Sequence, residues 1–232
     1  MNMETANLTA NTNAPADAGR IKALINKLEQ DRSLTRSEWT DLIRGRSPET
    51  AGYLFDRARK TRIRHYGHDV YIRGLIEFTN YCRNDCYYCG IRKSNPNAER
   101  YRLSKEEILD CCAHGYELGF RTFVLQGGED GWYTDERLAD IVASIRSRWP
   151  DCAITLSVGE RSRESYRILR EAGADRYLLR HETYDSSHYQ RLHPPALSAA
   201  HRQDCLWTLT ELGTPVGTGS MVAAPVQPSE NL

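Results

Sequence analysis

Hydrophobic positions recur every three or four residues over residues 20–69, for example at Ile21, Leu24 and Ile25. This period predicts amphipathic helices with one buried face each. Thr35, followed three residues later by a glutamate, carries the capping-box pattern that begins a helix. We therefore expect an N-terminal layer of helices.

From residue 70 the pattern changes to a buried strand, a polar loop and an amphipathic helix, repeated along the chain. The strands are almost continuously apolar, which is typical of a parallel sheet covered on both faces. Strands that alternate with helices predict an α/β fold. The expected strands are 75–79, 122–126, 153–158, 176–180 and 216–222, and the expected helices are 104–119, 135–149, 163–173 and 196–213.

Polar residues gather just after the predicted strands, where β/α barrels and doubly wound sheets both carry their chemistry. A TIM-type β/α barrel is the favoured fold, and a doubly wound open sheet is the alternative. Five strands and four helices do not close an eight-stranded barrel. We therefore expect residues 70–232 to form an incomplete barrel that lacks its C-terminal part, with residues 221–232 as a strand end and a loop.

The composition argues against two classes of partner. Lys and Arg number 31 and Asp and Glu number 31, so the formal net charge is zero and no bulk attraction to nucleic acid or membrane is expected. No apolar run is long enough to cross a bilayer. Residues 1–19 are rich in Asn, Thr and Ala, which predicts disorder, and they lack the pattern of a secretory signal. The expected compartment is the cytoplasm.

Three cysteines lie in the segment CRNDCYYCG, at positions Cys82, Cys86 and Cys89. In a reducing compartment clustered thiols are more often metal ligands than disulfides. A zinc site needs four ligands, and no fourth Cys or His follows at finger-like spacing. Iron–sulfur clusters are normally held by four thiolates, so three would leave one iron free to bind another molecule. We interpret the other cysteines as small buried residues: Cys111, Cys112, Cys152 and Cys205.

The spacing C-x3-C-x2-C directly after the first strand resembles the radical S-adenosylmethionine (SAM) superfamily. Further blocks, including VLQGGEDGWY, TLSVGER and EAGADRYLLRHET, resemble the HydE-type maturases of FeFe-hydrogenase over residues 71–221. The resemblance implies that the three cysteines hold a 4Fe–4S cluster that binds SAM and cleaves it to a 5′-deoxyadenosyl radical. It further implies a role in maturation of the hydrogenase H-cluster.

The same resemblance implies partners. The substrate would be a small molecule or a small iron complex. An electron donor such as a ferredoxin or flavodoxin would reduce the cluster, and other hydrogenase maturases are expected partners.

The resemblance also assigns cofactor-binding roles to other positions. Tyr88, just before the third cysteine, would lie near the adenine of SAM, with a purely structural tyrosine as the alternative. Glu182 would contact SAM. Arg202 would pair with the SAM carboxylate, with a solvated arginine as the alternative. A glycine-containing turn, whose backbone allows close approach, would receive the SAM amino group; it consists of Gly127, Gly128 and Glu129.

Two further residues are expected near the substrate. Thr155 and Arg180 would point into the barrel, and a buried Arg180 with no anionic partner would favour an anionic ligand. Two alternatives to the HydE type remain open. One is another radical SAM enzyme, related to methylornithine synthase or biotin synthase, although the later strands lack the extra cysteines of biotin synthase. The other is a truncated, non-catalytic remnant that still binds a cluster.

Overall fold

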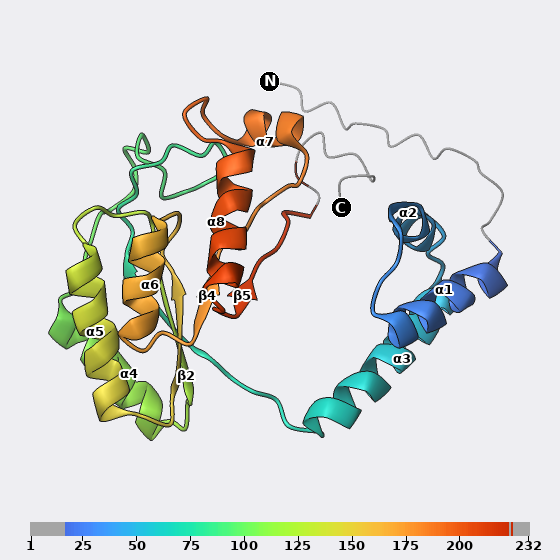
Figure 1. Cartoon of the computed structure of the whole chain (residues 1–232), viewed down its shortest axis with the longest axis horizontal. Helices are drawn as coiled ribbons and strands as arrows, with labels where there is room; N and C mark the ends of the chain where they lie inside the picture. The colour runs from blue at the N-terminus through green and yellow to red at the C-terminus, as the bar shows by residue number, and fades with distance from the viewer. Residues whose placement is uncertain (1–16, 223, 225–232) are drawn as a thin grey trace. The chain divides into compact units, whose positions relative to one another are not determined.

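The computed structural model describes residues 17–222 and 224, and the chain divides into two units with a border between Val70 and Tyr71. The described residues of the first unit, 17–70, form three helices: α1 (Ala18–Asp31), α2 (Arg36–Arg44) and α3 (Pro48–Tyr66) (Figure 1). Their apolar faces share a small core of Ile21, Leu24, Ile25, Leu34 and Leu42. This core includes Ile21, Leu24 and Ile25, whose spacing predicted the first helix.

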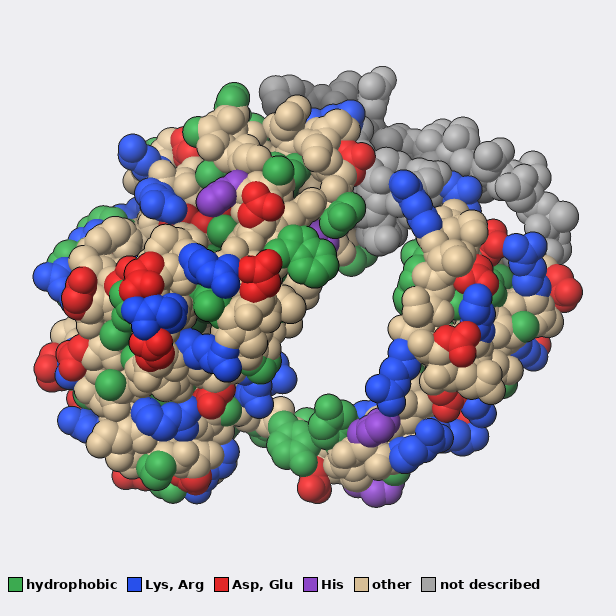
Figure 2. All heavy atoms as spheres, viewed as in Figure 1, with side chains coloured by type: hydrophobic (Ala, Val, Ile, Leu, Met, Phe, Trp, Pro, Cys, Tyr) green, Lys and Arg blue, Asp and Glu red, His purple; other side chains and the backbone are tan. Residues whose placement is uncertain are grey.

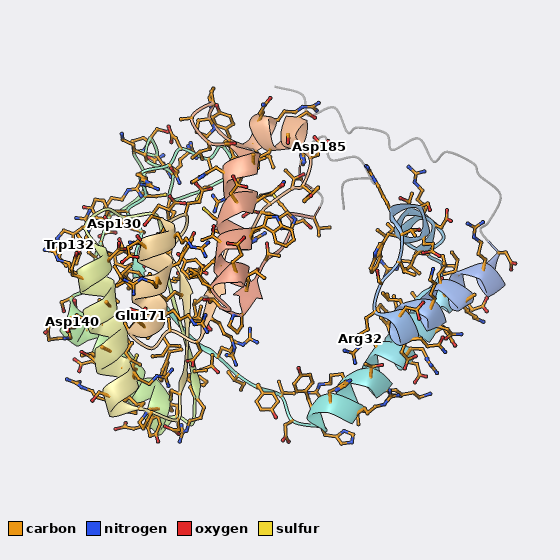
Figure 3. All side chains as sticks on the ribbon, viewed as in Figure 1. Arg32, Asp130, Trp132, Asp140, Glu171 and Asp185 are labelled. Atoms are coloured by element: carbon orange, nitrogen blue, oxygen red, sulfur yellow. The ribbon has the colours of Figure 1, made fainter. Side chains whose placement is uncertain are left out.

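Side-chain caps define where these helices begin. The Asp17 carboxylate accepts a hydrogen bond from the backbone N–H of Gly19, so α1 starts at Ala18, two residues before the predicted start. Thr35 and Glu38 form the predicted capping box of α2. At the other end of α1, Arg32 has a left-handed backbone with φ of 55° and ends the helix (Figure 3). Residues 1–16 of the predicted disordered tail lie outside the described residues.

The second unit is an α/β layer of alternating strands and helices. Within residues 71–222, five strands form one parallel sheet in the order β1-β2-β3-β4-β5. Its elements are β1 (Gly74–Thr79), α4 (Lys105–Glu117), β2 (Thr122–Gly127), α5 (Asp135–Arg148), β3 (Ala153–Ser157), α6 (Arg163–Glu171), β4 (Arg176–Leu178), α7 (Ser186–Leu192), α8 (Ala199–Glu211) and β5 (Val216–Gly217).

The strand order distinguishes the two predicted folds. In a doubly wound sheet the order reverses at a switch point, whereas here each strand lies beside the next one in the chain. That is the order of a β/α barrel wall. The prediction of a partial barrel is confirmed, and the doubly wound alternative is wrong.

One face of the sheet packs on the helices and forms the main core. Phe78, Phe123, Leu125, Ile154 and Leu156 alternate along β1 to β3 and are almost completely buried. Figure 1 shows α4, α5 and α6 along this face. The residues between them point to the opposite face, which is the inner face of the barrel wall.

The later elements differ from the prediction. Strand β4 ends at Leu178 and β5 holds only two residues, so both are shorter than expected. Helix α7 was not predicted: Asp185 begins it by accepting a hydrogen bond from the His188 N–H at 2.6 Å. Figure 3 labels Asp185 at this position. The predicted C-terminal loop lies almost wholly outside the described residues.

Among the described residues, no helix combines the length and the apolar character that crossing a membrane requires. Acidic and basic side chains are interspersed over the face shown in Figure 2, consistent with the zero net charge. In the first unit several arginines are paired with acids, including Arg57 with Glu29 and Arg59 with Asp56. The face of the described residues shown in Figure 2 therefore carries charges of both signs.

Candidate functional site

A pocket of about 320 Å³ lies at the C-terminal ends of β1 to β4. Loops that follow parallel strands meet at this end of a barrel wall, which is where such folds place their chemistry. Nearly all the predicted site residues line this pocket: Cys82, Cys86, Tyr88, Cys89, Gly127, Gly128, Glu129, Arg180, Glu182 and Arg202.

Thr155 is the predicted site residue that does not line the pocket. It lies on β3 opposite Val124 of β2, two positions before Ser157. Ser157 does line the pocket. Side chains two apart on a strand share a face, so Thr155 faces the barrel interior one layer further from the pocket.

The three cysteines belong to the segment between β1 and α4, residues 80–104, which we call the cysteine loop. All three are free thiols of intermediate exposure. The N–H of Cys89 donates to the carbonyl of Cys86 at 3.1 Å, which closes a tight turn between them. Burial raises the pKa of the Cys82 thiol. It also raises the pKa of Cys86 to about 11, with a further contribution from the neighbouring thiols Cys82 and Cys89.

The three thiols face one pocket. No group of three His, Cys, Asp or Glu side chains in the described part of the chain is arranged to hold one metal ion. In a 4Fe–4S cluster each thiolate binds a different iron, so a cluster draws on ligands that are more widely spread than those around one zinc ion.

The glycines of the predicted turn have a specific packing role. A Cβ on Gly128 would lie 2.2 Å from the Tyr81 carbonyl oxygen and 2.8 Å from the Cys82 Cβ, and one on Gly127 would lie 2.6 Å from the Thr79 Cγ2. The turn after β2 therefore passes directly against the cysteine loop, which only glycine permits. The backbone that Gly128 approaches is that of the cysteine loop, and the predicted contact of this turn with the SAM amino group stays a prediction.

Glu129 joins this turn to two other segments. Its carboxylate pairs with Arg83 of the cysteine loop at 3.0 Å and accepts a hydrogen bond from the N–H of Glu160 at 3.0 Å. Its backbone carbonyl accepts a second hydrogen bond from the N–H of Arg83 at 3.0 Å. Neither Arg83 nor Glu160 was predicted as a site residue. The charge of Arg83 between two cysteines and the position of Glu160 just after β3 were the available signals.

Glu182 combines burial with an unusual backbone. It is 8% exposed and has a positive φ of 63°, a conformation that non-glycine residues seldom adopt. Its Oε2 atom lies 3.2 Å from Arg180 Nη2 without forming a hydrogen bond. Burial raises the pKa of Glu182, while Arg180 and Arg202 oppose that shift. A buried acceptor facing a pocket is suited to a ligand that donates hydrogen bonds.

The environment of Arg180 differs from the prediction. Its side chain is 52% exposed and has Glu182 as an anionic partner. The expectation of a buried arginine that needs an anionic ligand for its charge is therefore wrong. Arg180 lines the pocket as a half-exposed cation.

Arg202 is buried, so the alternative of a solvated arginine is wrong. Its Nε lies 2.7 Å from Glu160 Oε1 and its Nη2 lies 3.9 Å from Glu129 Oε1. Burial alone would lower the pKa of Arg202, but Glu160, Tyr189 and Glu129 together outweigh it and the pKa is raised. The guanidinium therefore stays charged at the wall of the pocket.

Tyr88 is held by a residue that was not predicted. Its hydroxyl lies 3.1 Å from Nε2 of His193, which follows α7. Burial lowers the pKa of His193, so its imidazole is neutral at neutral pH.

The remaining cysteines mostly match the prediction. Cys112, Cys152 and Cys205 are buried, as expected for small core residues. Cys111 is exposed, so its predicted burial is wrong. Neighbouring positions on α4 point in different directions, and Cys112 occupies the core side of that helix.

Comparison with known proteins identifies the family. Residues 76–232 match the model of the radical SAM superfamily. The FeFe-hydrogenase maturase subunit HydE of Thermotoga maritima is 41% identical over 211 residues, which is 91% of this chain and 60% of that protein. The 3-methylornithine synthase of Methanosarcina acetivorans is 32% identical over 168 residues, or 72% of this chain and 47% of that protein.

Solved structures agree on the fold. The crystal structure of methylornithine synthase superposes with a TM-score of 0.76 at 28% identity, covering 86% of this chain and 59% of that one. The hydrogenase maturase HydG superposes with a TM-score of 0.78 at 24% identity, covering 89% of this chain and 47% of that one. This chain thus spans no more than about 60% of the length of these relatives. The predicted resemblance to the HydE type is confirmed, and the chain belongs to the radical SAM superfamily.

Proposed function

We propose that this chain carries the cluster- and SAM-binding core of a HydE-type radical SAM enzyme that acts in maturation of FeFe-hydrogenase. The observation that carries the proposal is the pocket at the strand ends. It brings three half-buried thiols together with a glycine turn, a buried acid and a buried arginine. A 4Fe–4S cluster bound there would supply the electron that cleaves SAM to a 5′-deoxyadenosyl radical.

The residues of the pocket divide the work of binding. Cys82, Cys86 and Cys89 would hold the cluster, and the raised pKa of Cys86 means that its thiol must lose a proton to do so. Glu182 has a buried oxygen that makes no hydrogen bond, so it can accept one from the amino or ribose groups of SAM. Arg202 would offer its charge to the SAM carboxylate.

The other pocket residues would position the segments of the site or contact the substrate. Gly128 lets the turn and the cysteine loop lie in contact, and Glu129 ties the two together through Arg83. Arg180, half-exposed beside Glu182, is available to an anionic part of the substrate. Thr155 would contact substrate only deeper in the barrel interior.

The HydE type is favoured over other radical SAM relatives because the identity to HydE is higher and covers more of the chain than the identity to 3-methylornithine synthase. The proposed substrate is a small iron complex. An electron donor such as a ferredoxin or flavodoxin and the other hydrogenase maturases are the proposed partners. The reduced thiols required by the pocket suit the cytoplasm.

Electron paramagnetic resonance tests the core of this proposal. The protein is reconstituted anaerobically with iron and sulfide, reduced, and measured with and without SAM. We expect a reduced 4Fe–4S signal that changes when SAM is added, together with release of 5′-deoxyadenosine. Cys86→Ala should lose the cluster signal, and Cys111→Ala, a matched change at an exposed cysteine, should keep it.

Three results would contradict the proposal. Zinc in place of iron would exclude a cluster, and a cluster signal indifferent to SAM would favour a non-catalytic remnant. Formation of 3-methylornithine would assign the chain to that other branch of the superfamily.

A further inference from the structure

The cysteine loop rests on the segment formed by α7 and His193. The backbone N–H of Tyr87 donates to the carbonyl of Leu192, the last residue of α7, at 2.9 Å. The next residue of the loop, Tyr88, contacts the next residue of that segment, His193. Figure 1 shows α7 at the end of the barrel wall where the loops gather. Two consecutive residues of the loop are therefore fixed to two consecutive residues of this segment.

His193 is itself rigidly held. It is 1% exposed, and its ring stacks on Tyr189 with centroids 3.8 Å apart and an interplanar angle of 14°. Its Nδ1 lies 2.9 Å from the Tyr189 carbonyl oxygen. Because a carbonyl can only accept, Nδ1 carries the hydrogen, and Nε2 of the neutral ring is left as an acceptor. The Tyr88 hydroxyl, 3.1 Å away, is then the donor.

We propose that His193 is a positioning residue that presets the ring of Tyr88 at the wall of the SAM pocket. The two rings meet edge to face, with centroids 5.3 Å apart and planes at 85°. Tyr88 is 41% exposed. Packing on its buried side therefore does not by itself fix the orientation of the ring. The role of the ring toward SAM rests on the proposed function, whereas the His193–Tyr88 contact does not.

The second nitrogen of His193 distinguishes this role from ordinary core packing. The stack on Tyr189 and the bond to its carbonyl would already satisfy a histidine whose only task is to fill the core. The remaining nitrogen instead faces the hydroxyl of the aromatic residue directly before Cys89. A ring held in its binding orientation costs less conformational entropy when a ligand arrives.

The test uses paired variants. Tyr88→Phe removes the hydroxyl and keeps the ring. His193→Asn can still donate to the Tyr189 carbonyl but is too short to reach Tyr88, and His193→Gln can place an amide oxygen near the Nε2 position. Tyr87→Phe is the matched control, since its side chain is exposed and the change leaves its backbone hydrogen bond to Leu192 in place.

The first measurement is the SAM dissociation constant of the reconstituted protein by equilibrium dialysis. Loss of one hydrogen bond predicts about five- to tenfold weaker binding for Tyr88→Phe and for His193→Asn. The loss in the double variant should be clearly smaller than the product of the two single losses, because both changes remove the His193–Tyr88 contact. His193→Gln should recover most of the affinity, and Tyr87→Phe should match the wild type. Multiplicative losses in the double variant would overturn the proposal.

The second measurement needs no cluster. In the cluster-free protein a Tyr88 ring that is free to turn should shield the next residue, Cys89, less well. We therefore expect iodoacetamide to modify Cys89 about fivefold faster in Tyr88→Phe and His193→Asn than in the wild type, with Cys111 as the internal reference. Equal rates in all variants would overturn the positioning role. If the wild type bound a cluster but no SAM while these rates still changed together, the proposed cofactor role would fail and the positioning role would stand.

Discussion

At the scale of single residues, the pocket depends on glycines at which two segments approach so closely that a Cβ atom would clash. Gly159, just after β3, has a φ of +79°, and a Cβ there would lie 2.0 Å from the Cγ of Glu129. The Glu129 side chain thus packs directly on the backbone of Gly159. Its Oε1 atom accepts a hydrogen bond from the N–H of the next residue, Glu160, at 3.0 Å. Gly159 therefore shapes the site without offering a functional group.

We expect Gly159→Ala to lower the free energy of unfolding by about 2–3 kcal/mol, because it adds both an unfavourable φ and a clash with Glu129. Urea denaturation measures the loss. Gly131→Ala is the matched control, since a Cβ there meets nothing within 4 Å and its φ is not in the left-handed region. A Gly159→Ala protein as stable as the Gly131→Ala protein would contradict this account.

At the scale of elements, the sequence predicts what is encoded locally and misses what depends on distant contacts. The capping boxes at Thr35 and Ser104 are local patterns, and both are present. Helix α7 has seven residues, too few to show a helical period, so its Asp185 cap was the only local signal. His193 contacts Tyr88 across 105 positions, which no local pattern records.

Asp130 shows how one side chain can join elements. Its carboxylate accepts hydrogen bonds from Thr79 at the end of β1, from Arg102 of the cysteine loop at 2.6 and 3.0 Å, and from the N–H of Trp132 before α5. Figure 3 labels Asp130 and Trp132 at this junction. Burial alone would raise the pKa of Asp130, but Arg102 and the other donors outweigh it and the pKa is lowered.

A lowered carboxyl pKa stabilises the fold above the unfolded pKa of about 4 and ceases to do so as the pH falls through the folded value. We therefore expect Asp130→Asn to cost about 2–3 kcal/mol of unfolding free energy near pH 7. The difference from the wild type should shrink below about pH 4. Asp140→Asn, at an exposed pair with Lys105, should cost less than about 1 kcal/mol. A pH-independent difference for Asp130→Asn would show that the carboxylate charge is not what matters.

At the scale of the whole molecule, topology explains why so much of the site could be predicted. Parallel strands in sequential order bring the ends of β1 to β4 together, so residues as far apart as Cys82 and Arg202 line one pocket. Thr155 shows the limit of that argument, because strand alternation predicts the face of a side chain but not its depth. The partners of Arg180 and Arg202 were beyond prediction for a similar reason. Arg202 pairs with Glu160, an acid 42 positions away whose place only the fold defines, whereas Glu182 beside Arg180 was visible in the sequence but its contact was not.

Binding of a cluster should stabilise the folded protein, because a ligand that binds only the folded state shifts the equilibrium away from the unfolded state. The cysteine loop runs from residue 80 to 104 between β1 and α4 without a regular element of its own, so three new bonds to one cluster would restrain it strongly. We expect anaerobic loading to raise the thermal midpoint by about 5 °C or more and to slow amide exchange in residues 80–104, with little change at the C-terminal end of α5. Removing the iron with a chelator and an oxidant should reverse both effects.

Two variants serve as controls for this prediction. Cys111→Ser should respond to cluster loading as the wild type does, and Cys86→Ser should not respond. If loading stabilised Cys86→Ser as much as the wild type, the iron would be held somewhere other than at the three cysteines.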